Sequence, residues 1–538
     1  MALDPLELSP FTSKDMLVKH ALSVLGEDTQ LLDASRGGPN WQQRSIQCAW
    51  HVLGMYADYC FGGPVEQPII RLLPSGASLN HSAHFDRFAE AVVPLRETFD
   101  IGVSYLHKAW QYLAAEILPG ELRSNIIGAL IAAITGAYYP TPPTLDFVKP
   151  VAHRYLAHMF GTSLIGESFD VYLDNGATAA FGQVVSTMSR NRLINPGDKV
   201  AMVWPSYEPM KDLFTNQYGC GVVEIRRERS RNWQVVAEDL GKLADPAVKV
   251  LVIVSPGNPI DSILDSEFLD HIEGVVNRRP ELVILSDNVY TNFIAPGADN
   301  AMARMPRNVI PFYAPSKDFG LAGARIGVSW IHTASVLDAL LQQQAPEVAA
   351  EVDAFYKTRW AGGRPSFYNR LLMDAASVSF SHMSGLSGPA QVIFTLCALL
   401  PLMAPDEAAS YFHWLREELA GRMAALYEGL GIELSGDRFD FCSNYCTLVP
   451  LDEVAAAQGP ECARAFSQVP LWDFLKHLAH SRATIIMPGP AFGGEDRSAR
   501  ICLTSLGKTS YREVGRNIAE AISDHTLSTP CPQCDGNF

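Results

Sequence analysis

The feature that most constrains the fold is an alternation of short apolar runs with amphipathic segments between about residues 168 and 330. Such runs are typical of buried strands, and the segments between them are typical of helices that cover both faces of a sheet. The pattern predicts an α/β fold with a mainly parallel sheet, whose ligands lie beyond the carboxyl ends of the strands. The predicted strands are 169–173, 199–204, 248–254, 282–287 and 309–313.

The rest of the chain is predicted to build smaller units around this sheet, because 538 residues are too many for one small core. Thr12 or Ser13 is expected to cap a first helix. Further helices are expected over 391–404, 408–430 and 511–522, and further strands over 445–449, 484–487 and 500–503. We interpret the domains as an N-terminal segment that contributes to the small domain and the substrate site (1–75), a large domain (76–365), a small α+β domain (366–525) and a polar tail (526–538).

Composition narrows the class of protein. A hydrophobic content of 48% with 19% charged residues is typical of a globular enzyme, and a net charge of -16 argues against a nucleic-acid partner. The acidic N-terminus lacks the blocks of a signal peptide, and the apolar run 126–134 is too short for a membrane span. Ten scattered cysteines suit reduced thiols, and the Cys531-Pro-Gln-Cys534 tail lacks a second ligand pair. We therefore expect a cytoplasmic protein with no metal and no membrane partner.

Small, polar or charged groups follow the runs, where the fold would bring them to one edge of the sheet. The segment Asp174-Asn-Gly-Ala-Thr178 opens a helix, whose free N–H groups and threonine hydroxyl suit an anion. Taken alone, each such group also fits an ordinary cap or turn. The groups after the later runs are an aromatic ring, an amide, a carboxylate with a tyrosine, and a lysine with an arginine, namely Tyr207, Asn258, Asp287, Tyr290, Lys317 and Arg325.

Together these groups match the needs of a pyridine aldehyde that carries a phosphate. Lys317 alone also fits a surface lysine, but a lysine held against apolar neighbours loses its proton and attacks a carbonyl. A buried carboxylate such as Asp287 keeps a ring nitrogen protonated, which makes the ring an electron sink. The amide and the tyrosine suit the ring oxygen, and the arginine with a helix N-terminus suits the phosphate. The sequence therefore predicts an enzyme that uses pyridoxal 5′-phosphate (PLP).

This ordered set of residues resembles the fold-type I, aspartate aminotransferase superfamily of PLP enzymes. The resemblance implies an aspartate-aminotransferase-like fold with a large domain and a smaller α+β domain. It also implies a homodimer or higher homo-oligomer with shared active sites. Lys317 is implied as the catalytic Schiff-base lysine, and the implied cofactor contacts are Ala177, Thr178, Tyr207, Asn258, Asp287, Tyr290, Ser316, Lys317 and Arg325.

The N-terminal motifs resemble one branch of that superfamily, the aspartate 4-decarboxylases, over nearly the whole chain. The motifs are Leu8-Ser-Pro-Phe-Thr-Ser-Lys14, Asp33-Ala-Ser-Arg-Gly-Gly-Pro-Asn40 and Tyr139-Pro-Thr-Pro-Pro143. The resemblance implies an amino-acid substrate, decarboxylation with a side aminotransferase activity, and a catalytic role for Tyr139. The residues matching the substrate site are Lys14, Arg36, Tyr139 and Arg500, of which Arg500 is implied to bind the α-carboxylate.

The chain departs from the pattern of this branch at Ser35, Gly38, Asn288, Ala314 and Pro490-Ala491. Ala314 removes one phosphate donor, and the other departures are expected near the substrate side, where they could enlarge or repolarise the pocket. They favour an alternative, a biosynthetic relative that catalyses β- or γ-elimination, replacement or carbon–carbon bond formation on a larger amino acid such as S-adenosylmethionine. A non-catalytic PLP-binding regulator is a third hypothesis, against which the acidic charge and the intact Lys317 argue.

Overall fold

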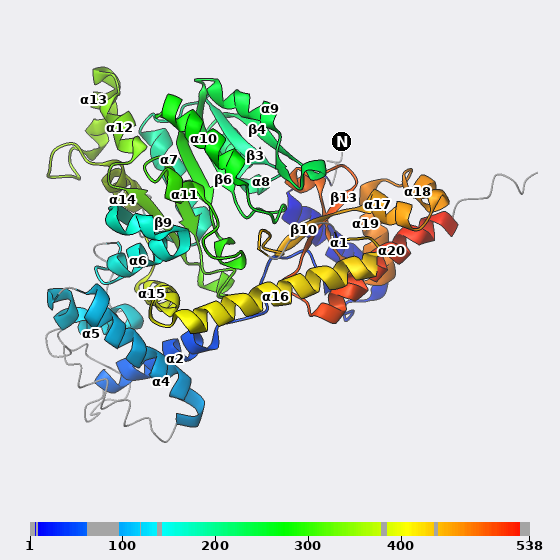
Figure 1. The fold of residues 1–538 in the computed structure, drawn as a ribbon, viewed down its shortest axis with the longest axis horizontal. Helices are drawn as coiled ribbons and strands as arrows, with labels where there is room; N and C mark the ends of the chain where they lie inside the picture. Colours follow the sequence, from blue (N-terminus) through cyan, green and yellow to red (C-terminus); the bar gives the residue numbers. More distant parts are fainter. Residues whose placement is uncertain are drawn as a thin grey trace, which may run out of the picture.

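An eight-stranded sheet forms the centre of the larger body of the molecule (Figure 1). The computed structural model describes residues 6, 9–61, 96–118, 120–136, 143–377, 385–434 and 440–527. The strands β8, β7, β6, β3 and β4 are parallel to one another, whereas β9 runs antiparallel between β2 and β8, and β5 antiparallel beside β4. In spatial order they are β2 (Phe169–Asp174), β9 (Gly327–His332), β8 (Val309–Tyr313), β7 (Val283–Asp287), β6 (Val248–Val254), β3 (Lys199–Trp204), β4 (Gly221–Glu228) and β5 (Gln234–Val235).

The mainly parallel sheet predicted from the sequence is confirmed, and the five predicted runs are all strands of it. Sequence analysis did not predict β4, because Glu224, Arg226, Arg227 and Glu228 interrupt its apolar character. It also did not predict β9, although β9 is completely buried.

Helices cover both faces of the sheet and divide its buried side chains into two cores. One core is packed by α6 (Val148–Phe160), α10 (Ser266–Arg278), α11 (Ala301–Arg304) and α15 (Gly388–Met403), and it extends to α2 (Arg44–Phe61), α4 (Arg96–Tyr112) and α5 (Gly120–Thr135). The other is packed by α7 (Ala177–Arg190), α8 (Glu208–Asp212), α12 (Val336–Gln342) and α14 (Phe367–Ser377). Two further helices are α9 (Ala237–Leu240) and α13 (Pro346–Tyr356).

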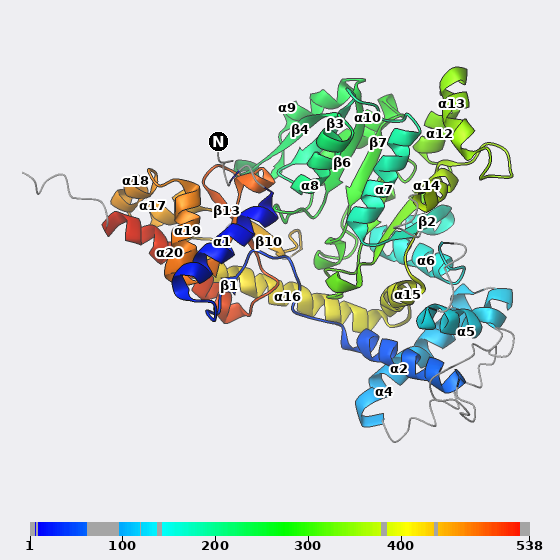
Figure 2. The same cartoon turned by 180° about the vertical axis from the view of Figure 1, so that it is seen from behind.

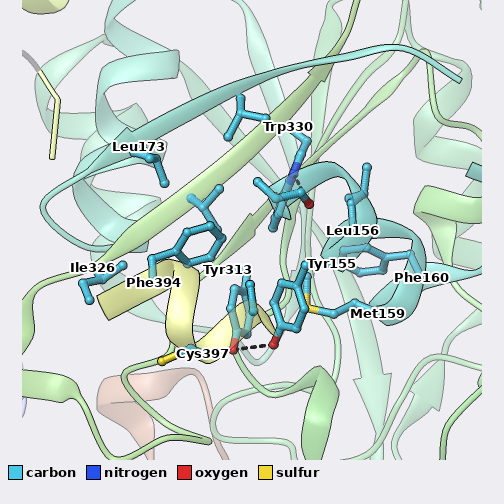
Figure 3. Close-up of a cluster of buried hydrophobic side chains, with 14 of the residues drawn as sticks. Tyr155, Leu156, Met159, Phe160, Leu173, Tyr313, Ile326, Trp330, Phe394 and Cys397 are labelled. Carbon is cyan, nitrogen blue, oxygen red and sulfur yellow. Dashed lines mark hydrogen bonds between the residues drawn. The ribbon is translucent and has the colours of Figure 1, made fainter. Parts of the chain in front are cut away.

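The first core anchors the strand that leads to Lys317. Figure 3 shows Tyr155 of α6 beside Tyr313, the last residue of β8, with a hydrogen bond of 2.9 Å between their hydroxyl oxygens. The Tyr313 hydroxyl also contacts Asp318, donating to Oδ2 at 2.6 Å. The loop after β8 is therefore tied to the packed interior.

The smaller body combines both ends of the chain (Figure 2). Its antiparallel sheet has the order β10 (Cys446–Pro450), β13 (Ser498–Cys502), β12 (Met487–Pro488). The N-terminal strand β1 (Leu32–Asp33) pairs in parallel with β11 (Thr484–Ile485). The helices that pack here are α1 (Pro10–Leu25), α17 (Leu451–Ala457), α18 (Pro460–Phe466), α19 (Leu471–Arg482) and α20 (Lys508–Leu527).

The 26-residue helix α16 (Pro405–Leu430) joins the two bodies, with Ala408 in the first core and Leu415 onward in the core of the smaller body (Figure 1). Because α14 and α15 pack on the large sheet, we propose that the domain boundary lies within α16 rather than near residue 365. The boundaries near 75 and 525 stay predictions.

The start of the first helix differs from the prediction. The expected cap of the first helix is wrong: α1 begins earlier, at Pro10, and the Ser9 hydroxyl accepts the N–H of Thr12. Pro10 suits that start because its fixed φ fits the first helical position, where no N–H bond is lost.

Among the described residues no single helix is long and apolar enough to cross a membrane. Only α15 and α16 taken together, a pair bent by 105°, have the length and composition of a membrane span.

Candidate active site

A cavity of about 370 Å³ brings together residues from distant parts of the chain at the carboxyl ends of β6, β7 and β8. All twelve predicted site residues that the structure describes line it. Tyr139 lies outside the described residues. The twelve are Lys14, Arg36, Ala177, Thr178, Tyr207, Asn258, Asp287, Tyr290, Ser316, Lys317, Arg325 and Arg500.

Lys317 is held in place through its backbone as well as its side chain. The Trp41 indole donates to the Lys317 carbonyl at 3.1 Å, and the buried Asp318 accepts from Asn292 at 2.6 Å. The Lys317 amine donates to the carbonyl of Gly37 at 3.1 Å. Burial lowers the pKa of Lys317, and the nearby positive charge of Arg500 acts in the same direction. A lysine in this state provides the neutral amine that a Schiff base requires.

A carboxylate and two hydrogen-bond donors lie near this lysine. Asp287, at the end of β7, is 8% exposed, and burial raises its pKa to about 6 although the Val289 N–H bonds to it at 3.1 Å. A cationic ring nitrogen would stabilise the ionised form of such a carboxylate. Burial raises the pKa of the Tyr290 hydroxyl well above its ordinary value, so that this hydroxyl remains a donor. The Asn258 Oδ1 accepts from Arg500 at 3.0 Å, which leaves its amide N–H groups for a ligand.

The start of α7 and Arg325 form a corner whose positive charge suits an anion. Ala177 and Thr178 are the first residues of the 14-residue helix α7, whose N–H groups carry partial positive charge. Gly176 precedes the helix with φ of +101°, and a Cβ there would lie 2.5 Å from a guanidinium nitrogen of Arg325. The absent side chain therefore leaves room for Arg325 beside the helix N-terminus. Ser316 lines the same cavity and adds a hydroxyl.

A second group of basic residues comes from the smaller body. Arg500 is 6% exposed, and its guanidinium donates to the Ser35 carbonyl at 3.2 Å and lies 4.5 Å from the centre of the Phe492 ring. Lys14 pairs with Asp33 at 3.0 Å. Arg36 is exposed, and no ion pair to it is found among the described residues. Arg36 is therefore the exposed member of this second group and is open to a ligand.

The charge balance of the cavity favours anionic ligands. Among the described residues, five basic side chains and a single carboxylate line it, although the chain as a whole has a net charge of -16. The basic residues come from both bodies, so a ligand with a phosphate and carboxylates would have a cation for each.

The structure corrects one expectation about the departures. Asn288 does not face the substrate side: its side chain lines a separate cavity of about 180 Å³, with Ser255 and Arg416. The physical reason is that neighbouring residues at a strand end point to opposite faces, so Asp287 faces one cavity and Asn288 the other. Ser35 and Ala314 do line the candidate site, whereas Gly38 and Pro490-Ala491 are not among its described lining residues.

Sequence analysis missed several neighbours of Lys317. The Gly37 carbonyl accepts from Tyr445 at 2.7 Å as well as from the lysine, and the Lys317 amine lies 5.4 Å from the centre of the Tyr445 ring. Cys446 lies against Asn258 with its sulfur 3.5 Å from Oδ1. No local signal marked these residues, because they reach Lys317 only through the packing of the smaller body.

These residues fit PLP. The buried Asp287, the low-pKa Lys317 and the corner at Gly176 and Arg325 supply a partner for the ring nitrogen, an amine for the aldehyde and a site for the phosphate.

The fold matches that of known aminotransferases. An aspartate aminotransferase from Rhizobium meliloti superposes with a TM-score of 0.59 at 14% identity, covering 97% of this chain and 99% of the other. Cystalysin from Treponema denticola, described as containing a pyridoxal 5′-phosphate cofactor, gives 0.52 at 16% identity, covering 74% and 88%. These likenesses show an aspartate-aminotransferase-like fold, as predicted.

Sequence comparison identifies the family. The profile of the family described as aminotransferase class I and II matches residues 154–353. Kynurenine–oxoglutarate transaminase 1 of Mus musculus is 23% identical, covering 48% of this chain and 65% of its own length. The bifunctional aspartate aminotransferase and L-aspartate beta-decarboxylase of a Pseudomonas species is 30% identical over 520 residues, 95% of this chain and 94% of that protein. The chain therefore belongs to the class I and II aminotransferase family of enzymes, which use pyridoxal 5′-phosphate.

Proposed function

We propose that the enzyme acts on L-aspartate as a 4-decarboxylase with a side aminotransferase activity. The observation that carries the proposal is that Arg36, Arg500 and Lys317 line one cavity. The two arginines suit the two carboxylates of aspartate, and Lys317 suits the proton transfer at the carbon that bears the amine. The similarity to the Pseudomonas protein over 95% of this chain supports the same assignment.

The proposed roles of the cofactor-binding residues follow from their chemistry. Asp287 would pair with the ring nitrogen, and Asn258 and Tyr290 would donate to the ring oxygen. Thr178, Ser316, Arg325 and the Ala177 end of α7 would hold the phosphate, and Tyr207 would lie against the ring. When bound, PLP supplies an electron sink for the negative charge that develops at the substrate α carbon.

Lys317 is proposed to move the proton. In the presence of bound substrate, the Lys317 amine, whose neutral form burial favours, would take the proton from the α carbon as a general base. The Gly37 carbonyl, which accepts from the amine at 3.1 Å, would steady the amine during the transfer. Protonated Lys317 would then be the proton donor for the following step, through the same Nζ atom.

Two basic residues are proposed to hold the two ends of aspartate. Arg500 is buried and already oriented by Asn258 and Ser35, so it would bind the α-carboxylate as a fixed fork. Arg36 would bind the second carboxylate. Lys14 would help to position this region through Asp33, which also accepts from the N–H of Ser35 at 3.0 Å. Loss of the second carboxylate as carbon dioxide, with uptake of a proton at the β carbon, would give alanine.

The direct test is product analysis with purified PLP-loaded enzyme and L-aspartate. We expect carbon dioxide and alanine in equal amounts, with a slower, 2-oxoglutarate-dependent formation of oxaloacetate. The control is Lys317→Ala. Release of carbon dioxide from wild type at no more than the rate of this control would refute the proposal.

One observation favours the alternative of a larger amino-acid substrate. Lys14 is neutralised by Asp33 at 3.0 Å, so the cavity offers fewer unpaired cations for a second carboxylate than the sequence suggested. A screen of absorbance changes of bound PLP against amino acids, S-adenosylmethionine included, discriminates the two functions. A response to aspartate alone would exclude the alternative.

We also propose that the protein is a homo-oligomer, as the family resemblance implies. Light scattering after size-exclusion chromatography would test this, and a monomer at micromolar concentration would contradict it.

A further inference from the structure

Two cysteines face each other across neighbouring strands next to the candidate active site. Cys446 is the first residue of β10 and Cys502 is the last residue of β13, and the two are direct partners in the antiparallel register. Both side chains are fully buried. No disulfide links the cysteines within the part of the chain that the structure describes.

The register places this pair at the closest kind of cross-strand position. The N–H of Leu503 bonds to the carbonyl of Tyr445 at 2.9 Å, and the N–H of Cys502 points away from β10, to the carbonyl of Ala34 at 2.8 Å. Cys446 and Cys502 therefore form a non-hydrogen-bonded pair, in which Cα atoms lie roughly 4.5 Å apart. A disulfide spans Cα separations of about 4.4–6.8 Å, so a bond can form without separating the strands.

The two cysteine sulfur atoms lie close to residues that line the candidate site. The Cys446 sulfur is 3.5 Å from Asn258 Oδ1, which also accepts from Arg500. A Cβ placed on Gly37 would lie 3.7 Å from the Cys502 sulfur and 3.8 Å from the Lys317 amine. The thiols are thus next to residues that line the site.

The two thiols differ in acidity. Burial by itself raises the pKa of Cys502, but the hydrogen bond from Cys446 and the charges of Arg500 and Lys317 outweigh it and bring this pKa to about 7. The hydrogen bond to Cys502, with burial, raises the pKa of Cys446 well above its ordinary value. The Cys446 and Arg500 contributions do not depend on the state of Lys317. Cys502 is therefore the nucleophile of the pair, and Cys446 is the resolving thiol, which reacts second.

We propose that Cys446 and Cys502 are a reversible oxidation site, which a small peroxide converts into a cross-strand disulfide beside the cofactor lysine. The Cys502 thiolate attacks one oxygen of hydrogen peroxide, the O–O bond breaks, and the departing hydroxide takes up a proton as water. The Cys446 thiol then attacks the sulfur of the resulting Cys502 sulfenic acid. The S–S bond forms, the S–O bond breaks, and the hydroxyl leaves with the Cys446 proton as a second water. Two thiols lose two electrons in total, and one peroxide is reduced.

The disulfide changes the site in two ways. It removes the Cys446 thiol, whose sulfur lies 3.5 Å from Asn258 Oδ1, and it removes the thiolate charge near Lys317. Both changes act on residues proposed to contact the cofactor or the substrate. We therefore expect oxidation to shift the absorbance band of bound PLP and to lower turnover, and a dithiol reductant to reverse both effects.

Mass spectrometry of peroxide-treated holoenzyme tests the proposal directly. After removal of peroxide, free thiols are alkylated under denaturing conditions and the protein is digested with trypsin without reduction. The tryptic peptide 501–508 contains Cys502 as its only cysteine, whereas the peptide 439–464 contains Cys442, Cys446 and Cys462. We expect these peptides to be linked and lighter by two hydrogen atoms, with fragment ions that place the bond on Cys446.

Two variants serve as controls. Cys462→Ser, a substitution in the remote helix α18, should keep the linked peptide and the reductant-reversible loss of turnover. Cys446→Ser should give no link and should leave Cys502 as a sulfenic or higher acid. The proposal is overturned if both thiols of treated wild type are still alkylated, if Cys502 is linked to another cysteine, or if the dithiol does not reverse the oxidation. The wild-type result decides the matter even if Cys446→Ser fails to fold.

Discussion

Removal of the Tyr445 hydroxyl should loosen the loop that holds Arg36. In the structure the Gly37 carbonyl accepts from both Tyr445, at 2.7 Å, and Lys317, at 3.1 Å. A lysine nitrogen that is double-bonded to the cofactor keeps at most one hydrogen. In the loaded enzyme Tyr445 is therefore the main donor to this carbonyl. Tyr445→Phe would then leave a part-buried carbonyl without this partner.

The size of the effect follows from that lost partner. An unsatisfied buried acceptor costs about 1–3 kcal/mol, and for the part-buried Gly37 carbonyl the lower end applies, about 1 kcal/mol or roughly fivefold in an equilibrium constant. We expect kcat/KM for the amino acid to fall by about this factor, mainly through KM, because Arg36 adjoins Gly37. PLP affinity should change little, since the residues proposed to hold the cofactor are untouched.

The matched control is Tyr368→Phe, which removes a tyrosine hydroxyl that donates to the Val171 carbonyl at 3.0 Å in the larger body. Steady-state kinetics, PLP titration and thermal unfolding are measured for both variants. Both should unfold at lower temperature, but only Tyr445→Phe should raise KM. Equal kinetics for the two variants, or a loss confined to PLP affinity, would refute the reasoning.

Three further perturbations address other parts of the site. Burial raises the pKa of Asp287 to about 6, so the contribution of this group to apoenzyme stability should be greatest below pH 4 and fall by about 3 kcal/mol as pH rises through 6. In urea unfolding at pH 5 and 8, apo Asp287→Asn should show a smaller fall in stability than wild type, and the variant should bind PLP more weakly. An unchanged pH dependence of the unfolding free energy would contradict this. Gly176→Ala should weaken PLP binding about tenfold or more in a fluorescence titration, because its Cβ displaces Arg325 and its φ is +101°. Gly182→Ala, in the same helix with open space around it, should bind PLP normally and be slightly more stable. Arg36→Gln should raise KM for L-aspartate about tenfold, through loss of a charge-assisted hydrogen bond, and change KM for L-alanine in transamination less than about twofold; equal effects on both substrates would argue against contact with a second carboxylate.

Much of the candidate site could be predicted because its residues follow strands whose apolar character is strong. Asn258, Asp287 and Lys317 come after β6, β7 and β8, and the carboxyl ends of parallel strands meet at one edge of a sheet. The start of α7 was visible for the same reason. Strand β4 was missed because its charged residues hide the pattern, and the direction in which Asn288 points could not be read from its type.

The sequence by itself determined the α/β class, the order of the strand-end groups and, through them, the PLP chemistry. These properties depend on residue type and local periodicity, which the chain displays along its length. Only the tertiary structure decided which distant residues surround Lys317: the Gly37 carbonyl, Tyr445 and the facing thiols of Cys446 and Cys502 come from strands and loops 128 to 280 residues away along the chain. Arg500 and Ser35, which also meet beside the site, are 465 residues apart. Such contacts depend on how β1, β10 and β13 pack against the large sheet, and local sequence patterns carry no information about that packing.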